Sequence, residues 1–235
     1  MVKHGLIICC LLVLFQWVSA IGIAKYRFHV MPETSYYGGI QSISKDSLGR
    51  MWYTGPDAIF MYDGSKFHQF NDIVSAIRPQ VKWGYGSLIT DRQGRLFLTT
   101  NYGLLQFNYE QFSFDLLVFG KIRSVVLHDD EKLYMLSGDS LLCYDQARKK
   151  TTGFPLPKHG FFNTILSLDG DLYLAKEGAV FKLDSSKRRG ELFAKFAATA
   201  STANDAVLYN GLYYFLTPRD GIYVTDNTGD IKKNV

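Results

Sequence analysis

The chain has 235 residues and a formal net charge of +4, from 26 Lys and Arg against 22 Asp and Glu. A net charge of +4 is too small to indicate a basic surface for nucleic acid, so we expect this segment to bind no nucleic acid. Aromatic residues make up 15% of the chain, a content that favours β-sheets over helices.

The first twenty residues have the pattern of a secretory signal. Lys3 supplies positive charge, residues 6–18 form a largely apolar run, and Val18-Ser19-Ala20 resembles a signal peptidase site. The alternative is a membrane anchor, but the run is shorter than the roughly 20 apolar residues of a spanning helix. We therefore predict a signal peptide over residues 1–20, cleaved after Ala20, and export to the periplasm or the extracellular side.

The rest of the chain, residues 21–235, is expected to form one domain. Its sequence has no apolar run of roughly 20 residues, so we predict no membrane span after the signal peptide. Cys9 and Cys10 lie inside the signal, and neither follows the small residue that a lipid-anchor motif requires. Cys143 is then the single cysteine of the exported protein, and its apolar surroundings predict a buried structural thiol.

Five degenerate copies of one hairpin pattern follow in chain order. Each copy has a turn rich in Asp, Asn and Gly, a strand with an anchor aromatic, and a second strand that ends at Asp or Asn. The anchors recur every 37 to 45 residues, a period typical of propeller blades. The copies span residues 46–63, 91–108, 129–145, 169–184 and 210–226, with anchors Trp52, Phe97, Tyr134, Tyr173 and Phe215.

Further strands surround each hairpin. A strand is predicted before every copy, and a fourth strand after several copies. Four strands per repeat make a propeller blade, and the regular period favours this fold over a β-sandwich. The predicted strands are 40–44, 86–90, 122–127, 162–168 and 206–209 before the hairpins, and 66–70 and 111–117 after them.

The predicted fold is therefore all-β, a β-propeller with about five four-stranded blades. The tail Ile231–Val235 has two lysines and looks poor at completing a blade, so we expect the propeller to be incomplete or open. Residues 191–200 are the one run that would tolerate a helix. The chain is then a fragment, or further blades come from elsewhere.

The repeats resemble the two-component regulator propeller repeat. Residues 40–52 with Tyr62-Asp63-Gly64 match its pattern of an apolar strand, Asp-x-x-Gly-x-Leu-Trp and a closing aromatic and Asp, and residues 91–108 are the next best match. The later copies have Tyr or Phe in place of Trp and mostly lack the Gly-Thr element. The resemblance covers nearly all of residues 21–235.

Membership of that family would imply an extracytoplasmic ligand-sensing propeller of a larger receptor. In the family the propeller is followed by a Tyr-rich sandwich domain, a membrane helix, and either a histidine kinase with response regulator or a helix-turn-helix domain. Oligosaccharides are the ligands that the resemblance suggests. None of the downstream parts occurs in these 235 residues. The resemblance thus implies an N-terminal fragment whose output domains are missing, or a chain that acts alone.

No motif for catalysis or cofactor binding stands out, so we predict no enzyme, no catalytic residues, no metal and no cofactor. There is no Gly-x-Ser-x-Gly elbow, and no glycine-rich loop precedes a helix that could bind phosphate. The histidines lack metal-ligand spacing, and the most suggestive cluster, His128-Asp129-Asp130, falls on a turn. The alternatives are a secreted scaffold or interaction protein and, less favoured, a propeller lyase or polysaccharide-cleaving enzyme.

The sequence also predicts where a ligand would bind. The turn between the second and third strands of a blade lies on the same side as the link to the next blade, and the longest link spans Asn71–Ser87. Long loops on rigid scaffolds concentrate binding residues, and aromatic rings beside polar groups suit an oligosaccharide. The alternative is that Trp83 packs over the edge of the blade. The predicted ligand-binding residues are Arg78, Trp83, Tyr85, Asn101 and Tyr102.

Overall fold

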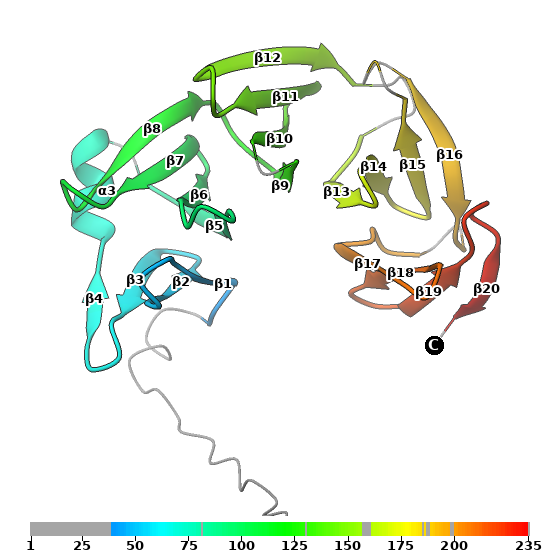
Figure 1. The fold of residues 1–235 in the computed structure, drawn as a ribbon, viewed down its shortest axis with the longest axis horizontal. Helices are drawn as coiled ribbons and strands as arrows, with labels where there is room; N and C mark the ends of the chain where they lie inside the picture. The colour runs from blue at the N-terminus through cyan, green and yellow to red at the C-terminus, as the bar shows by residue number, and fades with distance from the viewer. Residues whose placement is uncertain are drawn as a thin grey trace, which may run out of the picture. The chain divides into compact units, whose positions relative to one another are not determined.

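Five four-stranded antiparallel sheets make up almost all of the computed structural model (Figure 1). The structure describes residues 39–80, 82–129, 131–156, 161–184, 186, 189–197 and 200–234, and the predicted signal peptide lies outside them. All of these residues belong to the unit formed by residues 33–235. Within the described ranges, no helix is long and apolar enough to cross a membrane.

Each sheet contains four strands that are consecutive in the sequence and paired in that order. Blade 1 comprises β1 (Ser42–Lys45), β2 (Met51–Gly55), β3 (Ala58–Tyr62) and β4 (Phe67–Gln69), and blade 2 comprises β5 (Tyr85–Thr90), β6 (Leu96–Thr100), β7 (Gly103–Asn108) and β8 (Ser113–Phe119). Blade 3 comprises β9 (Ser124–His128), β10 (Lys132–Ser137), β11 (Ser140–Asp145) and β12 (Lys150–Pro155). Blade 4 comprises β13 (Thr164–Leu168), β14 (Asp171–Lys176), β15 (Ala179–Leu183) and β16 (Gly190–Lys195), and blade 5 comprises β17 (Asp205–Tyr209), β18 (Leu212–Thr217), β19 (Gly221–Thr225) and β20 (Ile231–Asn234).

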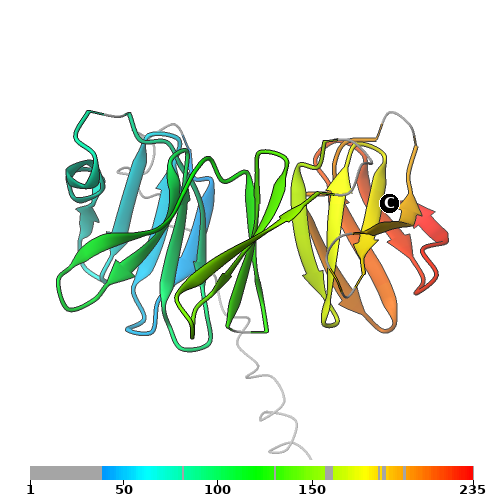
Figure 2. The same cartoon turned by 90° about the horizontal axis from the view of Figure 1, so that it is seen from above.

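The first strands of successive sheets lie side by side. β1 contacts β5, β5 contacts β9, β9 contacts β13, and β13 contacts β17. Figure 1 shows the sheets following one another, with the fourth strand of each sheet on the outer side, and Figure 2 shows the same sheets from above. This is the blade arrangement of a β-propeller, and the five sheets do not close into a ring (Figure 1). The predicted all-β propeller fold with open ends is confirmed.

Turn chemistry explains why the hairpin pattern recurs. In blade 1 the Asp46 carboxylate accepts hydrogen bonds from the backbone N–H groups of Leu48 and Arg50, and Gly49 adopts a φ of 81° that a side chain would disfavour. Asp91 and Gly94 repeat this turn in blade 2. Blades 4 and 5 use tighter turns, in which both central residues have positive φ. Those residues are Asp169-Gly170 and Asn210-Gly211.

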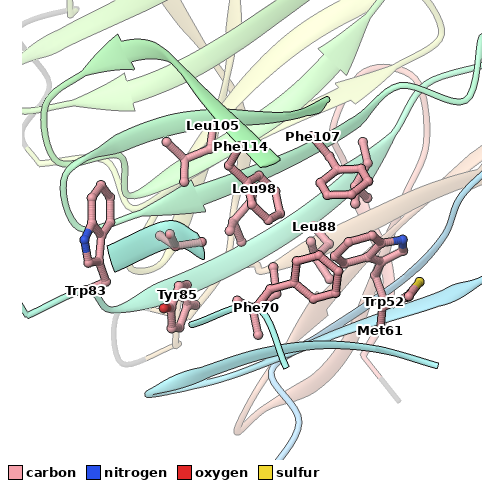
Figure 3. Packing of buried hydrophobic residues seen from close by; sticks show 13 residues of the cluster. Trp52, Met61, Phe70, Trp83, Tyr85, Leu88, Leu98, Leu105, Phe107 and Phe114 are labelled. Atoms are coloured by element: carbon pink, nitrogen blue, oxygen red, sulfur yellow. The ribbon is translucent and has the colours of Figure 1, made fainter. Parts of the chain in front are cut away.

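The anchor aromatics form the core between neighbouring blades. The Trp52 ring is fully buried, and its centroid lies 4.8 Å from that of Phe70 and 4.7 Å from that of Phe107 in blade 2 (Figure 3). Phe97, Tyr134 and Tyr173 likewise belong to core clusters shared with the next blade along the chain. Four of the five anchors therefore occupy equivalent sites.

The fifth anchor, Phe215, is not equivalent to the others. Tyr173 pairs with Lys182, two residues before the Asp that ends its hairpin, whereas in blade 5 Tyr214 holds that register by pairing with Val224. Phe215 lies on the opposite side of the strand and packs back against blade 4, in the cluster that contains Tyr173. The reason is the turn between β18 and β19, which has three residues where the other blades have two. The extra residue increases by one the distance along the chain between the anchor position and the Asp that ends the hairpin.

The end of blade 5 also differs from the expectation. Ile231–Asn234 were expected to be a poor strand, yet they form β20, in which Lys233 pairs with Val224. The pairing uses backbone groups, and all four residues are exposed, so lysine side chains remain in water at this outer edge. The first half of the run that would tolerate a helix, residues 191–195, instead belongs to strand β16 (Gly190–Lys195).

Candidate functional site

One side of the blades carries both the turns between second and third strands and the links between blades. Strand direction alternates in each sheet, so the end of the second strand, the end of the fourth and the start of the next blade meet on this side. We call it the link face. Its first link (residues 70–84) and fourth link (residues 196–204) are built very differently.

The first link begins with the short helix α3 (Asn71–Ile77), which the sequence analysis did not predict. Asn71 anchors it to blade 1, because its Oδ1 accepts a hydrogen bond from the Ile59 N–H and its Nδ2 donates to the Asp57 carbonyl. Val74 is fully buried against the blades, and Asp72 in the first turn suits the helix dipole. The helix thus covers the gap between blades 1 and 2.

The structure brings most of the predicted ligand-binding residues together at the end of this link. Trp83 and Tyr85 are only 4% and 7% exposed and belong to the core cluster of blades 1 and 2 (Figure 3). The Tyr102 ring meets Trp83 edge-on at 5.4 Å. Asn101 holds the link, accepting a hydrogen bond from the Gly84 N–H and donating one to the Lys82 carbonyl. Packing is thus the role that the structure shows for Trp83, as the alternative interpretation expected.

Arg78 contacts the Phe119 ring, which lies beside this group because Phe119 pairs with Gly103, the residue after Tyr102. Its guanidinium is 4.9 Å from the centroid of the Phe119 ring, at the end of β8. Arg78 and Asn101 are exposed and Tyr102 is half-buried. These three side chains are the parts of the predicted site that a ligand on the link face can reach.

Burial changes the titration of Tyr85, and a pH dependence follows from it. Desolvation, with smaller contributions from Asp72 and Asp57, raises the pKa of the Tyr85 phenol to about 12. The folded state therefore favours the neutral phenol, a stabilisation that is complete below pH 10 and is lost as the pH rises through about 12. We expect Tyr85→Phe to reduce the loss of unfolding free energy between pH 10 and 12, measured by urea denaturation. An unchanged pH dependence in the variant would contradict this.

The fourth link leaves a cavity of about 450 Å³ between blades 4 and 5. The Asp220 carboxylate, in the turn between β18 and β19, accepts hydrogen bonds of 2.7 Å from both the N–H and the hydroxyl of Ser201, which lower the pKa of Asp220. Asn163 donates to the Thr202 hydroxyl at 3.1 Å. The cavity is lined by Asn163, Glu177, Ala200, Ser201, Thr202, Asn204, Pro218 and Arg219.

The two links are held by the same kind of hydrogen bond but differ in the size of their side chains. Asn101 in blade 2 and Asp220 in blade 5 both reach from the turn between second and third strands to hold the incoming link. In the first link the Trp83 ring fills the space next to these hydrogen bonds. In the fourth link the corresponding segment, Ala200 to Asn204, has only small residues. The sequence analysis missed this cavity, although the run Ser201-Thr202-Ala203-Asn204 marks a segment without bulky side chains at the end of the fourth link.

Small polar side chains on the first strands join neighbouring blades near the innermost edge. The Ser42 hydroxyl accepts a hydrogen bond from the Leu88 N–H, the Ser124 hydroxyl accepts one from the Ile165 N–H, and His128 Nδ1 lies 2.9 Å from the Ser167 hydroxyl. In the part of the chain that the structure describes, no three His, Cys, Asp or Glu side chains gather as metal ligands would.

No family model matches the chain, and no curated protein matches its sequence. Solved structures do resemble it. Virginiamycin B lyase from Staphylococcus aureus is 14% identical, with a TM-score of 0.65 over 83% of this chain and 69% of the lyase. The extracellular domain of a protein described as a hybrid two-component system of Bacteroides thetaiotaomicron is 17% identical, with a TM-score of 0.68 over 88% of this chain and 28% of that one.

A second extracellular domain of the same description and organism is 17% identical, with a TM-score of 0.62 over 87% of this chain and 36% of that one. The present chain thus spans about a third of these two domains. A lyase and extracellular domains described as parts of hybrid two-component systems both occur among the similar structures, at identities well below 25%. These likenesses show the propeller fold and leave the function to be argued from the site.

Proposed function

We propose that this protein is the ligand-binding propeller of an extracytoplasmic receptor of the two-component type. The proposal includes export by the signal peptide over residues 1–20 and a propeller domain over residues 21–235. The similarity of the repeats to the two-component regulator propeller repeat supports it, as do the two extracellular domains among the similar structures. Kinase or DNA-binding output domains would then be supplied outside these 235 residues.

The observation that carries this proposal is the cavity of the fourth link. Glu177 and Arg219 balance each other in charge, and Asn163, Ser201 and Asn204 add neutral hydrogen-bonding groups. Several convergent polar groups in a cavity of this size suit a neutral, polyhydroxylated ligand, for which we propose an oligosaccharide. The first-link residues Arg78, Asn101 and Tyr102 would form a second contact region on the same face, at the junction of blades 1 and 2, with Trp83 and Tyr85 supporting them from the core.

We expect the full chain to bind at least one oligosaccharide on a glycan array, and Arg219→Ala and Glu177→Gln to weaken that binding at least about tenfold, because each removes a charged hydrogen-bonding group from the cavity. The affinities would be measured by isothermal titration calorimetry with the oligosaccharide found on the array. Both side chains lie at exposed turns, so the variants should fold normally.

The matched control is Arg92→Ala, which removes an exposed arginine from the turn between β5 and β6, on the opposite side of the blades. It should leave the affinity unchanged. Equal affinities in all variants would remove the fourth link from the site. Conversion of the bound oligosaccharide, seen by mass spectrometry, would instead identify an enzyme, and absence of any glycan binding would favour a scaffold protein.

A further inference from the structure

The junction of blades 1 and 2 encloses an arginine in aromatic rings, on the side opposite the link face. Arg50 Nε donates a 2.7 Å hydrogen bond to the Asp46 carboxylate. Its guanidinium carbon lies 6.0 Å, 5.3 Å and 5.7 Å from the ring centroids of Phe107, Tyr109 and Phe112. Arginine stacks well on aromatic faces, so the rings both cover the cation and fill the junction.

The next junction, between blades 2 and 3, has an equivalent arginine but an aromatic residue at only one of the three ring positions. Arg95 Nε donates to Asp91 at 2.6 Å, as Arg50 does to Asp46. The turns that face the two arginines are both four residues long, since Asn108 pairs with Ser113 and Asp145 with Lys150. The positions of Phe107, Tyr109 and Phe112 are therefore taken by Tyr144, Gln146 and Lys149.

The backbone confirms this equivalence. Phe112 and Lys149 have φ angles of 54° and 51°, a left-handed conformation that few non-glycine residues adopt. The two turns thus have the same shape, and only the side chains differ. The space that an aromatic ring fills in the first junction is left open in the second.

A cavity of about 470 Å³ results at the second junction. The side chain of Arg95 is 28% exposed there, against 15% for Arg50. Arg95 and Lys149 are balanced by Glu110 and Asp115, so the lining has no net charge. Its remaining members are Gln106, Phe107, Asn108, Tyr109, Leu117, Tyr144 and Gln146.

We infer that this junction pocket binds the aromatic ring of a small uncharged ligand. The ring would stack on the Arg95 guanidinium, as the Phe112 and Tyr109 rings do on Arg50. Amide and carboxylate groups of Gln106, Gln146 and Asp115 would hydrogen-bond to polar substituents of the ring, such as a phenol hydroxyl. The pocket lies away from the link face, so this inference does not depend on the proposed oligosaccharide site.

The test is a titration of the full chain with N-acetyl-L-tyrosinamide, followed by NMR chemical shifts. We expect saturable binding with a dissociation constant below about 1 mM, which is attainable for a ligand of this size. Lys149→Phe gives the second junction the residue that the first has at the equivalent position, Phe112. The new ring should fill the pocket, so we expect it to weaken binding more than about tenfold and to raise the melting temperature. Gln146→Tyr, which introduces the residue type of Tyr109 at the equivalent position, is the second variant and should weaken binding too.

Lys150→Phe is the matched control, because it makes the same change one residue along, at an exposed position outside the pocket lining, and it should bind like the wild type. The inference is overturned if the wild type shows no saturable shifts up to about 10 mM, or if both pocket variants bind as well as the wild type. It is also overturned if methyl β-D-glucopyranoside, tested in parallel, binds more tightly than the aromatic probe.

Discussion

Tyr173→Ala is expected to lower the unfolding free energy by about 3–5 kcal/mol, whereas Tyr214→Ala should lower it by no more than about 1.5 kcal/mol. The two tyrosines occupy the same register position in blades 4 and 5, as their pairing with Lys182 and Val224 shows. Tyr173 is fully buried against blade 5, so its loss leaves a cavity between two blades. Tyr214 lies on the far face of blade 5 and is half-buried.

Chemical denaturation of the two variants and the wild type, under the same conditions, measures this difference. Both variants remove a tyrosine from the same position in a blade. They differ only in whether a neighbouring blade packs over the side chain. Equal losses at both positions would show that burial between blades does not determine the contribution of the anchor. A larger loss for Tyr214→Ala would contradict the assignment of equivalent positions.

Asp46→Ala is expected to cost about 3–5 kcal/mol, the usual effect of removing one partner of a buried ion pair. The Asp46 side chain is fully buried, and its Oδ2 accepts hydrogen bonds from Arg50 Nε at 2.7 Å and Trp52 Nε1 at 2.9 Å. Its Oδ1 accepts two more from the backbone of the turn. Alanine would leave these donors without an acceptor and a largely buried guanidinium without its counterion.

The control is Asp205→Ala, which removes an exposed carboxylate at the start of β17 and should change the unfolding free energy by less than about 0.5 kcal/mol. Asp46→Asn separates charge from shape, because the amide keeps one acceptor oxygen and should therefore cost less than alanine. Thermal and urea unfolding would measure all three variants. A cost below about 1 kcal/mol for Asp46→Ala would show that the turn does not depend on its carboxylate.

The hairpins of the five blades could be predicted because their signals are local. A turn with Asp and Gly places residues in the backbone conformations it needs, and strand residues alternate between two faces, so both can be recognised within about twenty residues. The period of the anchors then identifies blades, and β2, β6, β10 and β14 all lie where the copies indicated.

The errors arose where a prediction depended on counting residues or on side-chain polarity alone. One extra residue in the turn before β19 moved Phe215 to the other face of its strand and put Tyr214 in the anchor position. The polar tail was discounted, although an outer strand needs only backbone partners on one side. Helix α3 is seven residues long, too short for a clear periodic pattern.

The sequence by itself determined the blade repeat, the positions of the turns and four of the five aromatic anchors that face the next blade, because these depend on contacts close along the chain. Only the tertiary structure decided which aromatic residues are core and where space remains between blades. Trp83 and Tyr85 looked like binding residues in a long link, and they are buried because blades 1 and 2 close around them. Both cavities depend on small or flexible side chains meeting across a junction between blades, and no local pattern encodes such a meeting.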